Sequence, residues 1–264
     1  MHLIHTYTIV MMAAILNGLS PELTLKLADK KLVTQHQQQT ELLKGSWQLT
    51  TGAARFTQLP AGATAVATLE DGYFTVAYFD KSNKEFLGTY GGTYTLGDNT
   101  LTQHYEYNTL DTALVGTTDK LNYTLQKGQL QLKNSKVQQT WDKVDETAAA
   151  SPLQGTWRIT GRAGQNSEIN QMRRGPRKTL KILSGNRFQW IAFNTDTKEF
   201  SGTGGGTYTA ENGKYTETIE FFSRNSSRVG ARLEFNFEVE DGKWLHTGQS
   251  STGKEINEVW EREH

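Results

Sequence analysis

The most conspicuous candidates for chemistry are the arginines of a basic segment, QMRRGPRKTLK, at residues 171–181. Arg173, Arg174 and Arg177 carry planar guanidinium groups, which bind carboxylates and phosphates through paired hydrogen bonds. We therefore expect this segment to form a loop over the open end of the fold that contacts an anionic group of a ligand. The alternative is a solvated loop, since short runs of charge are commonly exposed. No aromatic residues alternate with these cations, so nucleic-acid binding is not expected.

Three further side chains are candidates for ligand contact. Gln103 and Glu217 share the strand face of nearby aromatic residues, so both would point into an apolar interior. A carboxylate placed there needs a partner or a raised pKa, and the alternative is a hydrogen-bonded structural role. Trp190 stands where the related part of the chain has Val76. Its indole either fills the interior or forms a wall against a ligand.

Metal and nucleophile chemistry have little support in the sequence. The chain contains no Cys, which excludes disulfides and thiolate sites. His104 and His246 are not spaced as a pair of metal ligands, although a single His such as His246 is enough to hold a haem. We expect no metal, no cofactor and no catalysis. The alternative is a hydrolase or isomerase that uses a buried carboxylate.

These residues belong to two copies of one sequence unit. KEFLGTYGGTYT at residues 84–95 and KEFSGTGGGTYT at residues 198–209 share ten of twelve positions, at an offset of 114 residues. A unit of about 100 residues is the size of a domain, so the sequence predicts a duplicated domain. The copies begin and end at tryptophans: Trp47 and Trp141 in the first, Trp157 and Trp260 in the second.

Each copy is predicted to be all-β. RLEFNFEV at residues 232–239 alternates apolar and polar side chains, which places one strand face in a core. Turn sequences recur roughly every 8 to 12 residues, and about eight strands fit in each copy. The glycines in the repeated string indicate a sharp bend or a close approach of two backbones. On this alternation, Glu106 and Glu220 lie opposite the apolar face of their strands. We expect them to face solvent, and the alternative is that they line a polar barrel interior.

The Gly-x-Trp motifs at Trp47 and Trp157, with Arg262 after the last strand, resemble the lipocalins and the wider calycin group. GGTYT, YTETIEF and EVWER are similar to strings of bacterial secreted lipocalin-like domains of unassigned function. The resemblance implies two tandem antiparallel up-and-down β-barrels, each with a first-strand Trp at its floor and a late Arg packed over it. It also implies a small hydrophobic or amphipathic ligand inside a barrel. Lys143 stands where the first copy would need that Arg.

The expected domains are residues 1–40, a first barrel at 41–145 and a second at 151–264. The apolar run Ile9–Leu16 is too short to span a bilayer and is typical of a secretory signal, with an N-terminal helix as the alternative. Acidic and basic residues balance at 28 each, which gives no general attraction to nucleic acid or membranes.

We therefore expect a secreted or periplasmic binding protein with no integral membrane segment. It would be cytoplasmic if the N-terminus is not a signal. A structural or protein-interaction module with filled barrels is the alternative function. The sequence leaves the oligomeric state open.

Overall fold

The computed structural model describes residues 26, 30, 37–144, 151–163 and 168–263. Contacts divide the chain into residues 1–43 and one compact unit from Lys44 onwards. Residues 37–43 of the first part are helical. The predicted secretory signal at Ile9–Leu16 lies outside the described residues. Within the described residues, no helix has both the length and the apolar character needed to cross a bilayer.

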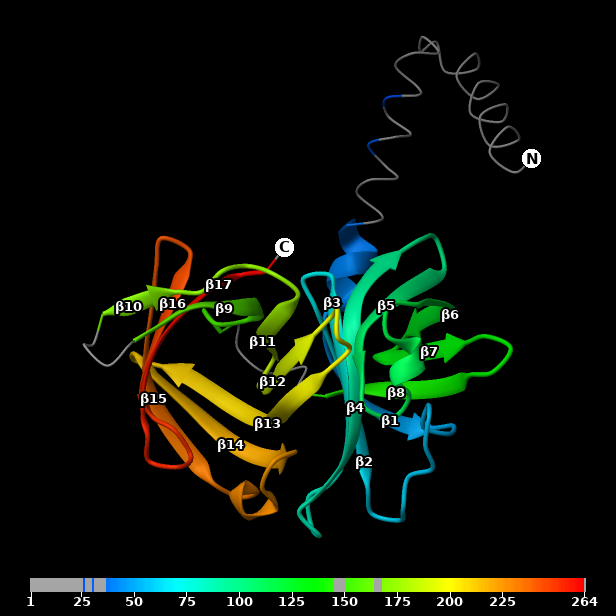
Figure 1. Cartoon of the computed structure of the whole chain (residues 1–264). Coiled ribbons are helices and arrows are strands. Elements are labelled where there is room, and N and C mark those ends of the chain that lie inside the picture. The colour runs from blue at the N-terminus through cyan, green and yellow to red at the C-terminus, as the bar shows by residue number, and fades with distance from the viewer. Residues whose placement is uncertain (1–25, 27–29, 31–36, 145–150, 164–167, 264) are drawn as a thin grey trace. The chain divides into compact units, whose positions relative to one another are not determined.

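The first copy folds as a closed barrel, barrel 1, in which each strand pairs with its neighbour in the chain and β1 pairs with β8. All of these pairings are antiparallel, so the up-and-down order expected from the sequence is present (Figure 1). A short 3-10 helix, Thr112–Leu114, precedes β6. The strands are β1 (Gly45–Thr51), β2 (Thr64–Glu70), β3 (Tyr73–Asp80), β4 (Glu85–Leu96), β5 (Thr100–Asn108), β6 (Thr118–Gln126), β7 (Gln129–Lys133) and β8 (Gln138–Val144).

The second copy repeats this order as barrel 2, closed by the pairing of β9 with β17. One short strand, β10, is added on the outer edge of β9. The fold is therefore all-β, with two tandem eight-stranded barrels. The strands are β9 (Gly155–Ala163), β10 (Ile169–Gln171), β11 (Arg177–Ser184), β12 (Arg187–Asn194), β13 (Phe200–Glu211), β14 (Lys214–Phe222), β15 (Arg232–Glu240), β16 (Lys243–Gln249) and β17 (Glu255–Arg262).

The repeated glycine string has a steric origin. A Cβ added at Gly92 would lie 2.0 Å from the carbonyl oxygen of His104, and one at Gly206 would lie 2.0 Å from that of Thr218. The close approach of backbones predicted for these glycines is therefore present. Next to each glycine the pairing of the two strands shifts register, between β4 and β5 and again between β13 and β14.

The packing of the two barrels against each other overturns the expected exposure of Glu106 and Glu220. Both side chains point out of their own barrel, as alternation predicts, but the other barrel covers that face. Each bulge also turns the next aromatic residue, Tyr107 or Phe221, outwards into the contact. Glu106 and Glu220 are accordingly only 9% and 8% exposed. Glu106 accepts a hydrogen bond from Lys178 of barrel 2 at 2.6 Å, and Glu220 accepts one from Lys81 of barrel 1 at 3.0 Å. Both carboxylates are therefore part of the contact between the barrels.

The contact between the barrels, which we call the seam, has a polar centre with aromatic groups beside it. The side-chain oxygen of Gln189 accepts a hydrogen bond from Thr75 at 2.7 Å. Its amide nitrogen donates to Thr89 and Thr203, both at 3.0 Å. A single buried amide thus binds hydroxyls from both barrels. Aromatic rings also pack across the seam. Phe79 stacks on Phe221, and Tyr107 packs at a tilt against Phe193.

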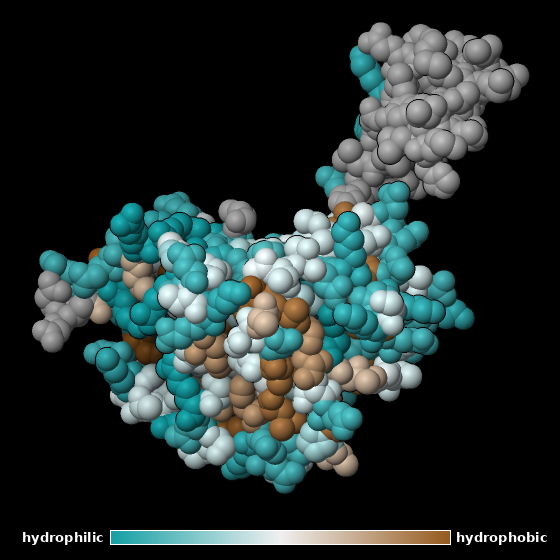
Figure 2. Space-filling view, turned by 45° about the vertical axis from the view of Figure 1, so that its right-hand side comes forward, coloured by the Kyte–Doolittle hydropathy of each residue, from teal (hydrophilic) through white to brown (hydrophobic). Residues whose placement is uncertain are grey.

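The outer surface is mostly polar. On the face in Figure 2, hydrophilic side chains surround an apolar area near the centre. The large apolar side chains among the described residues that are clearly exposed are few and scattered: Leu42, Met172 and Val239. Apolar groups are therefore concentrated in the seam and inside the barrels.

Candidate functional site

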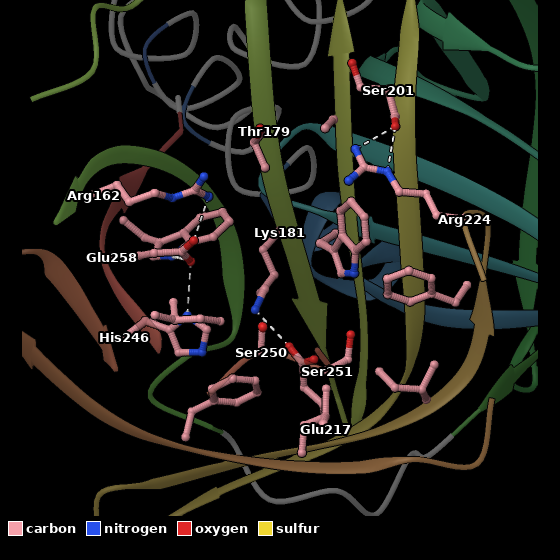
Figure 3. A pocket seen from close by; sticks show the side chains of 18 of the residues that line it. Arg162, Thr179, Lys181, Ser201, Glu217, Arg224, His246, Ser250, Ser251 and Glu258 are labelled. Atoms are coloured by element: carbon pink, nitrogen blue, oxygen red, sulfur yellow. Dashed lines mark hydrogen bonds and ion pairs between the residues drawn. The ribbon is translucent and has the colours of Figure 1, made fainter. Parts of the chain in front are cut away.

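Barrel 2 contains a cavity of about 410 Å³, whereas the pocket inside barrel 1 measures about 10 Å³. A cavity of the first size can hold a small organic molecule. Side chains from most strands of barrel 2 reach it, as Figure 3 shows. Its lining combines aromatic and aliphatic groups with charged ones: Arg162, Arg177, Thr179, Lys181, Trp190, Ala192, Ser201, Glu217, Ile219, Phe222, Arg224, Leu233, Phe235, His246, Ser250, Ser251, Ile256, Glu258 and Trp260.

The difference in volume follows from the residues at matched positions. Barrel 2 has small or aliphatic residues where barrel 1 has three tyrosines, at the constant offset of 114. The three replacements are Tyr78 by Ala192, Tyr90 by Gly204 and Tyr105 by Ile219. In barrel 1 these tyrosines are at most 2% exposed and their rings pack against one another. Removing them leaves space that barrel 2 does not refill.

A loop residue completes the filling of barrel 1. Arg55, which follows β1, is buried and donates hydrogen bonds to Gln103 at 3.0 Å and Asp119 at 2.5 Å. The guanidinium carbon lies 4.8 Å from the ring centre of Phe56 and 5.7 Å from that of Tyr105. Gln103 therefore has an internal partner and lies against a filled interior.

In barrel 2, the residue that corresponds to Gln103 is Glu217, and its partner comes from a strand instead of a loop. Lys181 of β11 donates a hydrogen bond to Glu217 at 2.8 Å. Both residues are about 5% exposed. The ammonium nitrogen also lies 4.9 Å from the ring centre of Tyr215 and 5.1 Å from that of Trp244. Lys181 is thus an ammonium group inside an aromatic cage, with a carboxylate beside it.

A second buried carboxylate, Glu258, also lines the cavity. It accepts hydrogen bonds from Arg162 at 2.6 Å, Trp260 at 3.2 Å and His246 at 3.3 Å. Burial favours its neutral form, but the His246 hydrogen bond and the Arg162 charge outweigh burial. They hold the pKa of the Glu258 carboxyl well below its usual range. Glu258 is therefore ionised at neutral pH.

This carboxylate determines the state of His246. Burial and the nearby charge of Lys181 lower the pKa of His246 below 6.5, although Glu258 acts in the opposite direction. The imidazole is thus neutral at pH 7. Because an ionised carboxylate only accepts hydrogen bonds, Nδ1 carries the proton and donates it to Glu258. The Nε2 atom of His246 is buried and has no hydrogen-bond partner among the residues that the structure describes.

The right-hand wall of the cavity in Figure 3 is aromatic and cationic. Trp190 packs edge-on against Phe222, with ring centres 5.6 Å apart. Both rings press on Gly204, where an added Cβ would lie 2.7 Å from the indole nitrogen. Arg224 lies 5.8 Å from the centre of the indole and donates two hydrogen bonds to the carbonyl of Ser201, at 2.9 and 2.6 Å. These contacts hold an exposed guanidinium beside the wall.

The residues predicted for ligand contact separate into two groups. Arg177, Trp190 and Glu217 line the cavity. Arg173 and Arg174 are exposed and do not line it, and Gln103 belongs to barrel 1. Arg174 instead forms ion pairs with Glu263 at 2.7 Å and Glu261 at 3.6 Å.

The predicted loop is also shorter than expected, because β11 begins at Arg177. Lys178 and Lys181 are therefore strand residues with opposite orientations. Lys178 pairs with Glu106 in the seam, and Lys181 points into the cavity. The basic segment is thus divided among the surface, the seam and the interior.

Five charged or basic residues of the cavity were not predicted from the sequence. A signal for them exists in the comparison of the copies, because barrel 1 has an uncharged residue at each matched position. Strand pairing is the same in both barrels, so the matches are direct. The five pairs are Arg162 with Gly52, Lys181 with Ala67, Arg224 with Leu110, His246 with Leu132, and Glu258 with Gln139.

The two barrels also differ in the contact between a cation and a tryptophan ring at the barrel floor. The guanidinium carbon of Arg262 lies 3.9 Å from the ring centre of Trp157. In barrel 1 the corresponding contact is longer, with the Lys143 ammonium 5.3 Å from the ring centre of Trp47. Arg262 also donates hydrogen bonds to the carbonyls of Gln154 and Pro152. The cation therefore lies closer to the indole in barrel 2 than in barrel 1.

One family model matches the second copy of the repeat. The family model described as a domain of unknown function (DUF4488) matches residues 152–264, which include all strands of barrel 2. No curated protein matches the chain. Within the part of the chain that the structure describes, no group of three or more acidic or His side chains is arranged to hold a metal ion.

Proposed function

We propose that barrel 2 binds a small, partly apolar anion in its cavity, and that barrel 1 is a filled structural module beside it. The observation that carries this proposal is the contrast between a cavity of about 410 Å³ in one copy and about 10 Å³ in the other. The lipocalin-like arrangement of strands and of Trp157 with Arg262 supports the same reading, since lipocalins enclose small apolar ligands.

The charge of the cavity supports an anionic ligand. Three arginines, one lysine and two carboxylates line it, and the neutral His246 adds no charge. Arg162 and Lys181 are paired with the carboxylates, which leaves Arg177 and Arg224 as the excess. Both are exposed strand-end or loop residues. A ligand carboxylate near them would keep its charge partly in solvent while its apolar part lies inside.

The cavity walls support an apolar body for this ligand. Trp190, Phe222 and Phe235 present ring faces or edges, and Ile219 and Ile256 add aliphatic surface. Apolar groups bury favourably against such walls, at about 25 cal/mol per Å². A medium-chain fatty acid such as decanoate has both features.

The test is titration of the whole protein with decanoate and with decanol, its neutral analogue, followed by calorimetry and by tryptophan fluorescence. Replacing Arg177 and Arg224 with Gln should weaken decanoate binding about tenfold, since exposed charge-assisted contacts contribute on the order of 1 kcal/mol. Decanol affinity should change less than about twofold, because no charge is involved.

A matched control removes two arginines that do not line the cavity, Arg228 and Arg232. The Arg228→Gln/Arg232→Gln variant has the same net charge as the first variant and should bind decanoate as the wild type does. An equal loss in both variants would show that only overall charge matters. If the wild type binds neither decanoate nor decanol, the binding function is wrong and the structural-module function takes its place.

We also propose that the protein acts outside the cytoplasm, on the strength of the apolar run Ile9–Leu16. The expected result is a mature protein that lacks this run. Intact-mass measurement of protein recovered from its native cells tests this, and a full-length mass would contradict it.

A further inference from the structure

We propose that Lys181 binds carbonyl ligands covalently, as a reversible imine, inside barrel 2. The proposal extends the anion-binding function above and gives its ligand a second feature, an aldehyde or ketone at the end remote from the anionic group. It rests on where Lys181 lies, on its partner Glu217, and on the residues that barrel 1 has at the same two positions.

Lys181 is placed for this chemistry. It extends from β11 into the pocket, with Glu217 next to its tip and Glu258 and His246 on the left in Figure 3. It is 4% exposed, so bulk water has little access to the amine. Imines hydrolyse in water, and a dry aromatic surround favours their persistence. Lysine amines in such sites are known nucleophiles toward carbonyls.

The fold does not require this lysine. The matched pair in barrel 1 is Ala67 with Gln103, and that barrel closes with the same strand order and pairing. A buried ion pair is usually no more stabilising than an uncharged replacement of similar volume. Lys181 and Glu217 are therefore better explained by a function of the cavity than by the stability of the barrel.

Glu217 supplies the proton transfers. Its carboxylate first accepts a proton from the Lys181 ammonium at 2.8 Å, which leaves a neutral amine with a free electron pair. The amine nitrogen attacks the carbonyl carbon, the C=O π bond opens, and a proton moves from nitrogen to oxygen to give a carbinolamine. Glu217 then protonates the hydroxyl, the C–O bond breaks, and water leaves.

The product is a protonated imine beside the ionised Glu217. One ammonium and one carbonyl have become one iminium and one water, with no redox change. The cavity contains the same charges before and after, so the carboxylate that pairs with Lys181 also pairs with the product. The aromatic cage formed by Tyr215, Trp244 and Trp260 faces a cation in both states.

The test uses 10-oxodecanoate, which is decanoate with an aldehyde at the far end, together with cyanoborohydride to reduce any imine to a stable amine. Peptide mass spectrometry then locates the modified lysines. We expect Lys181 to be labelled at least about tenfold faster than the exposed lysines Lys214 and Lys243, whose side chains are 53% and 51% exposed. Reactivity ordered by exposure, with Lys181 among the slowest, would overturn the proposal.

Two variants separate the imine from the ion pair. Lys181→Arg keeps a cation beside Glu217 but has no nucleophilic amine, so labelling in the cavity should disappear. Lys181→Ala/Glu217→Gln copies the barrel 1 pair, and its melting curve reports whether the fold is intact. If barrel 2 is labelled as extensively in both variants as in the wild type, Lys181 is not the site.

Decanoate distinguishes failure of this inference from failure of the proposed function. Wild-type protein that binds decanoate but gives no adduct at Lys181 contradicts the imine and leaves the anion site standing. An adduct at Lys181 without measurable decanoate binding supports the imine and contradicts the anion site. Absence of both contradicts both.

Discussion

Barrel 1 and barrel 2 have the same strand order and the same glycine-marked bulges, but their interiors have opposite character. In barrel 1, Tyr90 and Arg55 belong to a filled interior with a pocket of about 10 Å³. In barrel 2, Gly204 and Ala192 leave a cavity of about 410 Å³ with charged residues in its wall. Both barrels therefore close with the same glycines and tryptophans, although several of their interior residues differ.

The largest expected effect concerns the buried ion pair, which only barrel 2 contains. Lys181→Ala leaves the Glu217 carboxylate buried without its partner, so the free energy of unfolding should fall by about 3–5 kcal/mol. Adding Glu217→Gln restores the barrel 1 pair and should recover more than half of that loss. Urea denaturation of the three proteins measures this. A double variant as unstable as the single one would mean that barrel 2 has come to require the charges.

The next prediction fills the cavity with the residues of barrel 1. Ala192→Tyr/Ile219→Tyr copies Tyr78 and Tyr105 and should weaken decanoate binding about tenfold or more, roughly 1.4 kcal/mol, because the rings occupy the ligand's volume. Calorimetric titration measures the affinity, and a melting curve checks the fold. Unchanged affinity in a folded variant would place the ligand outside the cavity.

A smaller effect is expected at the barrel floors. Arg262→Ala should cost about 1 kcal/mol, since the guanidinium stacks on Trp157 at 3.9 Å. Lys143→Ala should cost less, because the ammonium lies 5.3 Å from the centre of the Trp47 ring. Thermal melts of the two variants give the comparison. A larger loss of stability for Lys143→Ala than for Arg262→Ala would contradict this prediction.

The smallest effect is the pH dependence caused by His246 and Glu258, which barrel 1 replaces with Leu132 and Gln139. The pKa of His246 is lowered below 6.5, so the unfolded chain binds a proton that the folded chain does not. Stability is therefore lost as pH falls below 6.5. Glu258, whose pKa is also lowered, adds a loss only below pH 4.5.

His246→Leu/Glu258→Gln copies Leu132 and Gln139 of barrel 1 and should flatten the decline below pH 6.5. The measurement is the urea midpoint as a function of pH, for the variant and the wild type. Parallel curves would show that groups elsewhere cause the decline.

The fold could be predicted from the sequence because duplication doubled every signal. The glycine-rich string at residues 84–95 and 198–209, the Gly-x-Trp motif and the turn sequences each occur twice. Together they define the barrels and their strands. The burial of Glu106 and Glu220 could not be predicted, because both side chains lie on the outer strand face, as alternation predicts, and the other barrel covers that face. Alternation within a strand indicates which face carries a side chain, and it does not report packing between two domains.

The site was predictable only in part, for physical reasons that differ between residues. Trp190 and Glu217 follow from strand alternation and from the comparison of the copies. Lys181 was assigned to a loop together with the rest of the basic segment, yet β11 begins at Arg177. His246 and Glu258 meet across the pairing of β16 with β17, a register that no local pattern specifies.

The seam centred on Gln189 has a consequence for the stoichiometry of the assembly. Two separate barrels joined by the same contacts would dissociate on dilution, and their ratio would depend on the synthesis of two chains. Within one chain, the effective concentration of each barrel at its partner is on the order of millimolar whatever the protein concentration. Barrel 2 therefore has its partner at the lowest expression level, and the filled barrel occupies that face of it permanently.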